Sequence, residues 1–163
     1  MKKCCLLLFL LLTVMIAGCR SNESQEITYP PIAYDPVSVD ESLQDQLTTV
    51  IHGYCLALEH HSYAELQSYA DEELPLCRNE TAFDDYTIGL SSVTVHSMDF
   101  DHLLKNGDDY LLKINYTLVF EGSFIDLDGN SMAPCTMELT DLFTLSLTDD
   151  QYLISSVQEY GEG

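Results

Sequence analysis

Basic residues are scarce in this chain. Its 163 residues contain six lysines and arginines against 27 aspartates and glutamates, for a net charge of −21. Nucleic acids and anionic lipid surfaces would be repelled by such a balance, so we expect no nucleic-acid partner. The hydrophobic content of 46% is too high for an acidic disordered protein. The sequence therefore predicts a folded domain with an acidic surface.

The chain also lacks a long hydrophobic run. Its most apolar stretch, Leu6 to Ala17, is interrupted only by Thr13. As a helix, twelve residues would span about 18 Å, well short of the ~30 Å hydrocarbon core of a membrane. Because Lys2 and Lys3 precede this stretch, the pattern is typical of a signal peptide, here residues 1–18, rather than of a permanent membrane span.

The end of this segment resembles a known processing site. Ile16-Ala17-Gly18-Cys19 is similar to the lipobox of bacterial lipoproteins, in which two small residues precede an invariant cysteine. The resemblance implies that Cys19 carries a diacylglycerol, becomes the new N-terminus and anchors an extracytoplasmic protein to the bacterial cell membrane. Loss of the two signal-peptide lysines leaves four basic residues against 27 acidic ones, a net charge of −23.

Processing also changes the cysteine count. Cys4 and Cys5 leave with the signal peptide, and Cys19 is committed to lipid. Three cysteines remain: Cys55, Cys77 and Cys135. They lack the close pairs of a zinc site, and no histidine or acid accompanies them at the spacing of a catalytic thiol. One disulfide with a free thiol and three reduced thiols both fit this count; if a bridge forms, we expect Cys55–Cys77.

Residues 19–37 contain three prolines and many polar residues without a regular period, which predicts a flexible tether. The domain of residues 38–163 follows. Ser38 and Glu41 match a helix capping box, and Ser62 and Glu65 match a second one before a short helix. Residues 76–85 are ambiguous and compatible with a further helical turn. The first helix has apolar residues at steps of three and four: Leu43, Leu47, Val50, Ile51, Tyr54, Cys55 and Leu58.

From residue 86 onward the hydrophobic period becomes two, which predicts strands. Turn residues separate the strands at Asn106-Gly107, at 128–130 and at Asp149-Asp150. Strands joined this closely should be antiparallel neighbours in a meander. The alternating runs lie in residues 93–95, 112–120, 137–145 and 152–160.

A long helix, a short helix and a curved four-stranded antiparallel sheet make an α+β plan. The stretch VIHGYCLALEHHSYAELQSYADEEL and the ending TDLFTLSLTDDQYLISSVQEY resemble NTF2-like (cystatin-like cone) domains. That resemblance implies a pocket between the sheet and the long helix. Some members of the family, such as ketosteroid isomerase and scytalone dehydratase, are enzymes with Asp, His and Tyr in the pocket, while many others bind ligands or assemble.

No catalytic motif matches residue by residue, so we expect no catalytic residue and no cofactor. Tyr54, His96 and Tyr116 are the candidate pocket residues, although a strand histidine is more often exposed. A metal site is not expected at His52 with Glu59-His60-His61, whose side chains point to different helix faces. It is not expected either at Asp126-x-Asp128-Gly129-Asn130, where a calcium loop would need an acid at position 137 and Met stands there.

The predicted function is a lipid-anchored, non-catalytic module that binds an unidentified small ligand or a protein partner. A pocket enzyme of the isomerase, dehydratase or hydrolase type is the alternative, and a cavity lined by convergent polar groups would favour it. A third alternative is a structural domain that forms homodimers through the face of its sheet.

Overall fold

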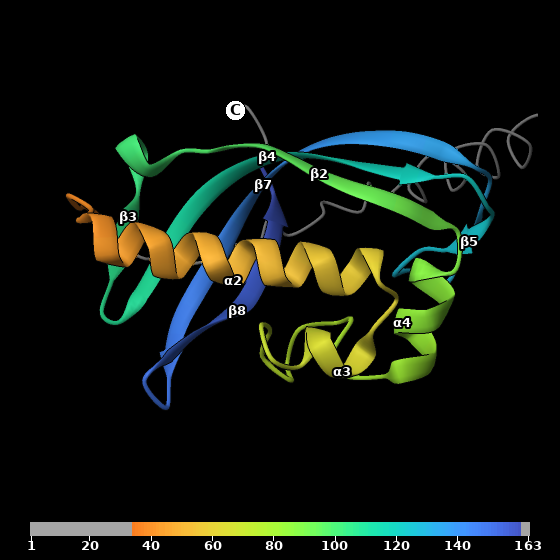
Figure 1. Cartoon of the computed structure of the whole chain (residues 1–163), viewed down its shortest axis with the longest axis horizontal. Coiled ribbons are helices and arrows are strands. Elements are labelled where there is room, and N and C mark those ends of the chain that lie inside the picture. Colours follow the sequence, from red (N-terminus) through yellow and green to blue (C-terminus); the bar gives the residue numbers. More distant parts are fainter. Residues whose placement is uncertain (1–33, 161–163) are drawn as a thin grey trace, which may run out of the picture. The chain divides into compact units, whose positions relative to one another are not determined.

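The structure is a computed structural model that describes residues 34–160. The predicted signal peptide, the lipidation at Cys19 and most of the tether lie outside the described residues. Within them, one long helix and two short ones accompany an antiparallel sheet, so the predicted α+β class is confirmed (Figure 1). No helix in this described part is long and apolar enough to cross a membrane.

The long predicted helix is α2 (Glu41–Glu59). The carboxylate of Asp40 caps it by accepting a hydrogen bond from the Leu43 N–H at 2.8 Å. The predicted cap at Ser38 is therefore wrong: the helix begins two residues later, because an aspartate both satisfies a free N–H group and favours the positive end of the helix dipole. The predicted apolar stripe faces the core, and its fully buried members are Leu47, Val50, Ile51, Tyr54, Cys55 and Leu58.

Two short helices follow. The first, α3 (Tyr63–Leu66), begins where the second capping box predicts it, with the Ser62 hydroxyl accepting from the Glu65 N–H at 3.3 Å. The second, α4 (Glu80–Thr87), is capped by the side chain of Asn79. Residues 76–85 were ambiguous in the sequence, and α4 begins in the middle of that stretch.

The four predicted strands are present; the first three are longer than their predicted periodic runs, and the fourth has the predicted length, shifted by one residue. They are β2 (Leu90–Met98), β4 (Asp109–Phe120), β7 (Cys135–Thr148) and β8 (Gln151–Glu159). Consecutive members of this series pair antiparallel, so the meander is confirmed. The Asp149-Asp150 turn joins β7 to β8 with positive φ angles of 51° and 65°, the geometry of a two-residue type I′ hairpin.

Short strands add to the predicted sheet. β1 (Asp35–Pro36) pairs with β3 (Leu104–Asn106), which pairs with β4, so the sheet has six strands rather than four. The fold therefore reaches back into the last residues of the predicted tether. A 3₁₀ turn, η1 (Phe100–His102), separates β2 from β3. β5 (Phe124–Ile125) and β6 (Ser131–Met132) form a separate hairpin.

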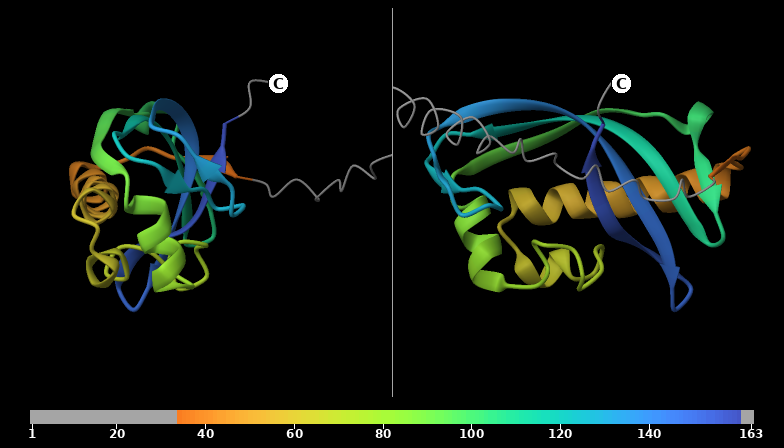
Figure 2. Two further views of the ribbon diagram at one scale, coloured as in Figure 1. Left: turned by 90° about the vertical axis from the view of Figure 1, so that its right-hand side faces the viewer. Right: turned by 180° about the vertical axis from the view of Figure 1, so that it is seen from behind.

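The sheet curves, and α2 runs along its concave face while α3 and α4 lie toward one end (Figures 1 and 2). Strand β4 shows why the two faces differ: its alternate residues from Tyr110 to Phe120 are buried, and the residues between them are half-exposed. The buried set packs into the core beneath α2. Side chains that reach this inner face near α4 come together at the site described next.

Candidate ligand-binding cavity

A cavity of about 280 Å³ opens between the inner face of the sheet and the helices. Tyr54 of α2, Tyr86 of α4 and Tyr116 of β4 contribute hydroxyl groups to its wall, and Asp141 of β7 and Glu159 of β8 contribute carboxyl groups. We call this site the tyrosine cavity. The apolar part of its wall consists of Leu74, Pro75, Leu76, Leu127, Leu139 and Val157.

The strand register places a tyrosine against an aspartate at the centre of the wall. Asp141 lies opposite Ile114, two residues from Tyr116 on the same face of β4, which makes Tyr116 and Asp141 diagonal neighbours. The Tyr116 hydroxyl donates a hydrogen bond of 2.6 Å to Oδ2 of Asp141. This distance is typical of a strong hydrogen bond involving a carboxyl group.

Asp141 is an unusual residue for the inside of a sheet, because only 7% of its surface is exposed. Burial raises the pKa of its carboxyl group, the Tyr116 hydrogen bond lowers that pKa in part, and the nearby charge of Glu159 raises it. Burial, reinforced by the bond to Asp141, raises the pKa of Tyr116 as well. The Tyr116 hydroxyl therefore stays protonated and acts as a donor.

The other two tyrosines also stay neutral. Burial is the main cause that raises the pKa of Tyr54, and burial together with Asp141 raises that of Tyr86 to about 12. Their rings are held edge-on against phenylalanines, Tyr54 against Phe143 and Tyr86 against Phe120. Fixed rings of this kind position their hydroxyl groups with little freedom.

Apart from the exposed carboxylate of Glu159, three side-chain oxygens of this wall have no hydrogen-bond partner among the described residues: the hydroxyls of Tyr54 and Tyr86, and Oδ1 of Asp141. In the same part of the chain, no side-chain nitrogen or oxygen that is sealed from solvent lacks a partner. These three oxygens therefore keep some contact with solvent, and their residues all line the cavity. Convergent polar atoms in a mostly apolar cavity are the usual mark of a ligand site.

The structure brings together two of the three predicted pocket residues. Tyr54 and Tyr116 line the tyrosine cavity, but His96 is exposed on the outer face of β2 and bonds through Nε2 to the Thr117 hydroxyl at 2.7 Å. Including His96 is thus a mistake of side-chain direction: Val95 is the residue that turns toward α2, and the ladder is irregular just after it.

Sequence reasoning missed Asp141, Tyr86 and Glu159. For Asp141 a signal existed, because it interrupts the alternating apolar run Met137, Leu139, Phe143 and Leu145 at a position that faces inward. A carboxyl group on an apolar face is costly to bury without a reason. No comparable signal marked Tyr86, which reaches the cavity only through the path of the chain between α3 and β2.

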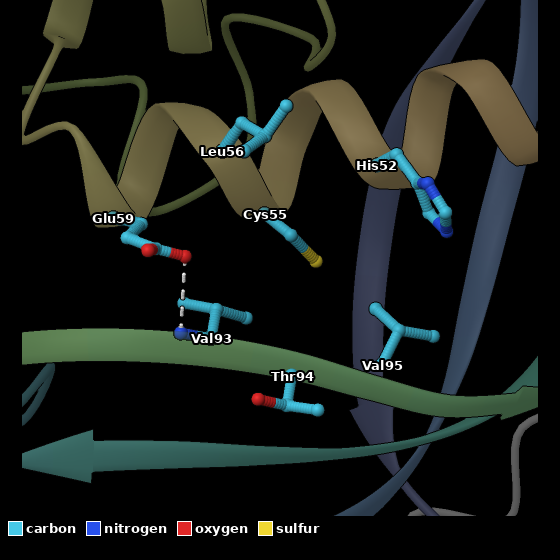
Figure 3. Close-up of a pocket in the computed structure, with 7 residues that line it drawn as sticks. All are labelled: His52, Cys55, Leu56, Glu59, Val93, Thr94 and Val95. Carbon is cyan, nitrogen blue, oxygen red and sulfur yellow. Dashed lines mark hydrogen bonds between the residues drawn. The ribbon is translucent and has the colours of Figure 1, made fainter.

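A second hollow, of about 260 Å³, lies on the other side of α2, and we call it the α2–β2 groove (Figure 3). His52, Cys55 and Glu59 project from α2 toward β2. Glu59 accepts a long hydrogen bond of 3.4 Å from the Val93 N–H. The side chains of α2 thus cover the free edge of β2, whose backbone groups would otherwise lack partners.

Cys55 and Cys77 show no reactive character. Cys55 and Cys77 are buried, and burial raises the pKa of Cys55 to about 12 and that of Cys77 to about 11. Thiols with such values are poor nucleophiles and poor metal ligands. All three, with half-buried Cys135, are free thiols in the structure, so the Cys55–Cys77 bridge stays a prediction about the oxidised protein.

The calcium-like segment forms the loop of the β5–β6 hairpin, as the sequence favoured. Oδ1 of Asp126 accepts from the backbone N–H groups of Asp128 and Asn130 at 3.0 and 2.7 Å. These bonds engage the carboxylate in the turn itself. Across residues 34–160, no group of three or more histidine, cysteine or acidic side chains is placed to hold a metal ion.

Comparison of the chain with protein-family models and with curated proteins finds no match. Solved structures do match. A protein of unknown function with a cystatin-like fold from Nostoc punctiforme has a TM-score of 0.54 at 8% identity, over 76% of this chain and 93% of the other. The protein Rd1NTF2_05, in a substituted form, has a TM-score of 0.50 at 9% identity, over 72% and 98%. The fold is NTF2-like.

A protein of unknown function from Mycobacterium tuberculosis matches similarly, with a TM-score of 0.52 at 10% identity over 72% of this chain and 70% of the other. Structural matches at identities this low establish the NTF2-like fold, but they say nothing about the activity of this chain. What the chain does must therefore be argued from its own cavity.

Proposed function

We propose that this protein is a lipid-anchored, extracytoplasmic bacterial module whose NTF2-like domain binds a small ligand in the tyrosine cavity. One observation carries the proposal: buried Asp141, bonded to Tyr116 through one oxygen only, lines a cavity together with Tyr54 and Tyr86, whose hydroxyls have no partner among the described residues. The volume lies at the lower end of the range for small-molecule sites, which favours a compact ligand.

Substitutions that narrow each hollow test the binding site. Val157→Phe adds volume to the wall of the tyrosine cavity, and Val93→Phe is the matched change in the α2–β2 groove. We expect fragments detected by saturation-transfer NMR on the wild-type chain to lose binding in the first variant and keep it in the second. Equal binding by both variants would place the ligand elsewhere.

The anchor is supported by the lipobox-like sequence before Cys19. Two acyl chains hold a protein stably to a bilayer, and the cysteine thiol is the group that carries them. A Cys19→Ala variant should move from the detergent phase to the aqueous phase in a Triton X-114 partition. Retention of this variant in the detergent phase would refute lipidation at Cys19.

A pocket enzyme is a second candidate function, and the convergence of polar groups favours it. Burial raises the pKa of Asp141, and a carboxyl group in that state could exchange protons with a bound carbonyl compound. If so, the wild-type chain should catalyse deuterium exchange next to the carbonyl group of a bound ketone, and Asp141→Asn should not. Identical exchange rates in the wild type and in Asp141→Asn would rule out this enzyme function and leave ligand binding as the proposed function.

The homodimer through the sheet is also a proposal. Side chains on the outer face bond mainly to one another: Asn115 donates to Ser97 at 2.7 Å and accepts from Thr140 at 2.7 Å. A face with its polar groups satisfied in this way can meet a second copy without leaving groups unpaired. Sedimentation equilibrium would detect the dimer as a doubled mass.

A further inference from the structure

We infer that the tyrosine cavity recognises a small organic cation, an ammonium group attached to a compact apolar body. This inference names the ligand class of the proposed binding site and therefore rests on the proposed function. It draws on the charge of the wall, the direction of its open hydrogen-bonding groups and the character of its remaining surface.

The charge of the wall is negative only. Asp141 and Glu159, opposite each other on β7 and β8, are its ionisable acids, and no basic residue lines it. The three basic residues in the described part of the chain lie elsewhere and have partners: Arg78 bonds to Glu73, Lys105 stacks on Tyr110, and Lys113 stacks on Tyr160. The net charge of −21 strengthens this field and repels anions.

The unpaired oxygens of the wall can accept hydrogen bonds, so they suit a ligand that donates them. The Tyr116 hydroxyl already donates its hydrogen bond to Oδ2 of Asp141, and Oδ1, which has no partner among the described residues, remains as an acceptor. The oxygens of Tyr54 and Tyr86 can accept as well. An ammonium group has up to three N–H donors and a positive charge, so it can satisfy this carboxylate and a tyrosine oxygen at the same time.

Burial makes the charge of the ligand decisive. A carboxylate with 7% of its surface exposed has lost most of its hydration, and no basic residue compensates it. A cation entering the cavity restores the missing interaction, whereas a neutral alcohol leaves the charge unbalanced and an anion adds repulsion. The tyrosine rings of the wall also attract cations that approach their faces.

The rest of the wall fits an apolar body. Leu76, Leu139 and Val157 line the cavity without polar atoms in their side chains, and Leu127 stands at its rim with 57% of its surface exposed. A hydrocarbon group held there would be removed from water while its ammonium group reaches the acids. The expected ligand is therefore an amine with a single small ring or a short branched chain.

Isothermal titration calorimetry on the full chain at pH 7 tests this class with three matched probes: benzylamine, benzyl alcohol and benzoate. We expect benzylamine to bind at least about tenfold more tightly than benzyl alcohol, since a hydrogen bond to a charged group is worth that much or more. Benzoate should not bind.

Two variants of the cavity wall and one control variant test where benzylamine binds. Asp141→Asn should weaken benzylamine binding about tenfold to a hundredfold while changing benzyl alcohol little. Glu138→Gln is the control, because Glu138 is exposed on the outer face of the same strand and its loss changes the net charge equally. Tyr54→Phe, which removes one hydroxyl and keeps the ring, should weaken benzylamine binding by a smaller factor.

The outcomes separate the two proposals. If benzyl alcohol or benzoate binds as tightly as benzylamine, the cation inference is wrong and the binding function stands. An equal loss in Glu138→Gln and Asp141→Asn would mean that benzylamine responds to the overall charge, which also overturns the inference. If none of the three probes binds, and the fragment experiment with Val157→Phe also finds no ligand, both proposals fail.

Discussion

The tyrosine cavity and the α2–β2 groove both lie beside α2 and have nearly the same volume, about 280 Å³ and about 260 Å³. They differ in what their acidic groups do. In the groove, Glu59 covers the free edge of β2 through the Val93 N–H. In the cavity, Asp141 has only 7% of its surface exposed and bonds to the Tyr116 hydroxyl. Burial of the acid, more than volume, distinguishes this candidate binding site from the groove, where Glu59 is only half-buried.

The largest expected effect comes from removing the aromatic ring that supports two tyrosines of the cavity. The Phe143 ring is 1% exposed and packs edge-on against both Tyr54 and Tyr116. Phe143→Ala should lower the free energy of unfolding by about 3–5 kcal/mol. Leu56→Ala, on a groove residue that is 49% exposed, should cost less than about 1 kcal/mol. Urea denaturation measures both, and similar losses would show that the two hollows are supported alike.

A smaller effect should follow from removing the hydroxyl of Tyr116. In Tyr116→Phe the buried carboxyl group of Asp141 loses its partner while the ring packing remains. The free energy of unfolding should fall by about 1–3 kcal/mol at pH 7. The double variant Tyr116→Phe with Asp141→Asn should cost less than the sum of the single changes, and additivity in this cycle would mean that the two groups do not interact.

Titration of single carboxyl groups should distinguish buried from exposed acids. Asp141 should have a pKa above its ordinary value of 3.8 because of burial, and Asp126 a pKa below 3.8 because Asn130 donates hydrogen bonds to it. Carbon-detected NMR of the side-chain carboxyl groups resolves both. An Asp141 pKa at or below 3.8 would mean that its carboxyl group is well hydrated and would contradict its burial.

The raised pKa of Asp141 makes the stability of the fold depend on pH. The folded state holds the proton of Asp141 more strongly than the unfolded state does, so this group favours folding at low pH. That contribution is lost as the pH rises from 3.8 through the folded pKa. The difference in unfolding free energy between wild type and Asp141→Asn should therefore move in favour of the variant over that window.

The smallest effect belongs to the groove. Glu59→Gln keeps a carbonyl oxygen that can accept from the Val93 N–H, and the existing bond is long at 3.4 Å. We expect a change in the free energy of unfolding of less than about 0.5 kcal/mol. A loss comparable to that of Tyr116→Phe would mean that the groove, too, contains an essential buried charge.

Periodicity predicted the parts of the fold that have many residues to show it. The stripe of α2 and the alternation in the long strands identified the helix, the meander and the class. The two-residue strands β1, β5 and β6 are too short for any period to emerge. The helix start was displaced because Ser38 and Asp40 are both good caps, and only the path of the chain decides between them.

The cavity was harder to predict because it depends on direction and on distant segments. His96 was named as a candidate although a strand histidine is more often exposed, and it is exposed because it alternates with Val95, which lies opposite buried Tyr116. Tyr54 and Tyr116 were recognised as candidates, but Asp141, the hydrogen-bond partner of Tyr116, was passed over in a run that otherwise reads as apolar. The charged residue that interrupts a buried face was the most informative position in that strand.

The most direct test of the central claim is a ¹H–¹⁵N NMR titration of the full chain with benzylamine. The account predicts that the largest shifts occur at residues of the tyrosine cavity, among them Tyr54, Tyr116 and Asp141, and that Asp141→Asn suppresses them. Largest shifts at His52, Glu59 and the facing part of β2 would place the site in the α2–β2 groove and contradict the account.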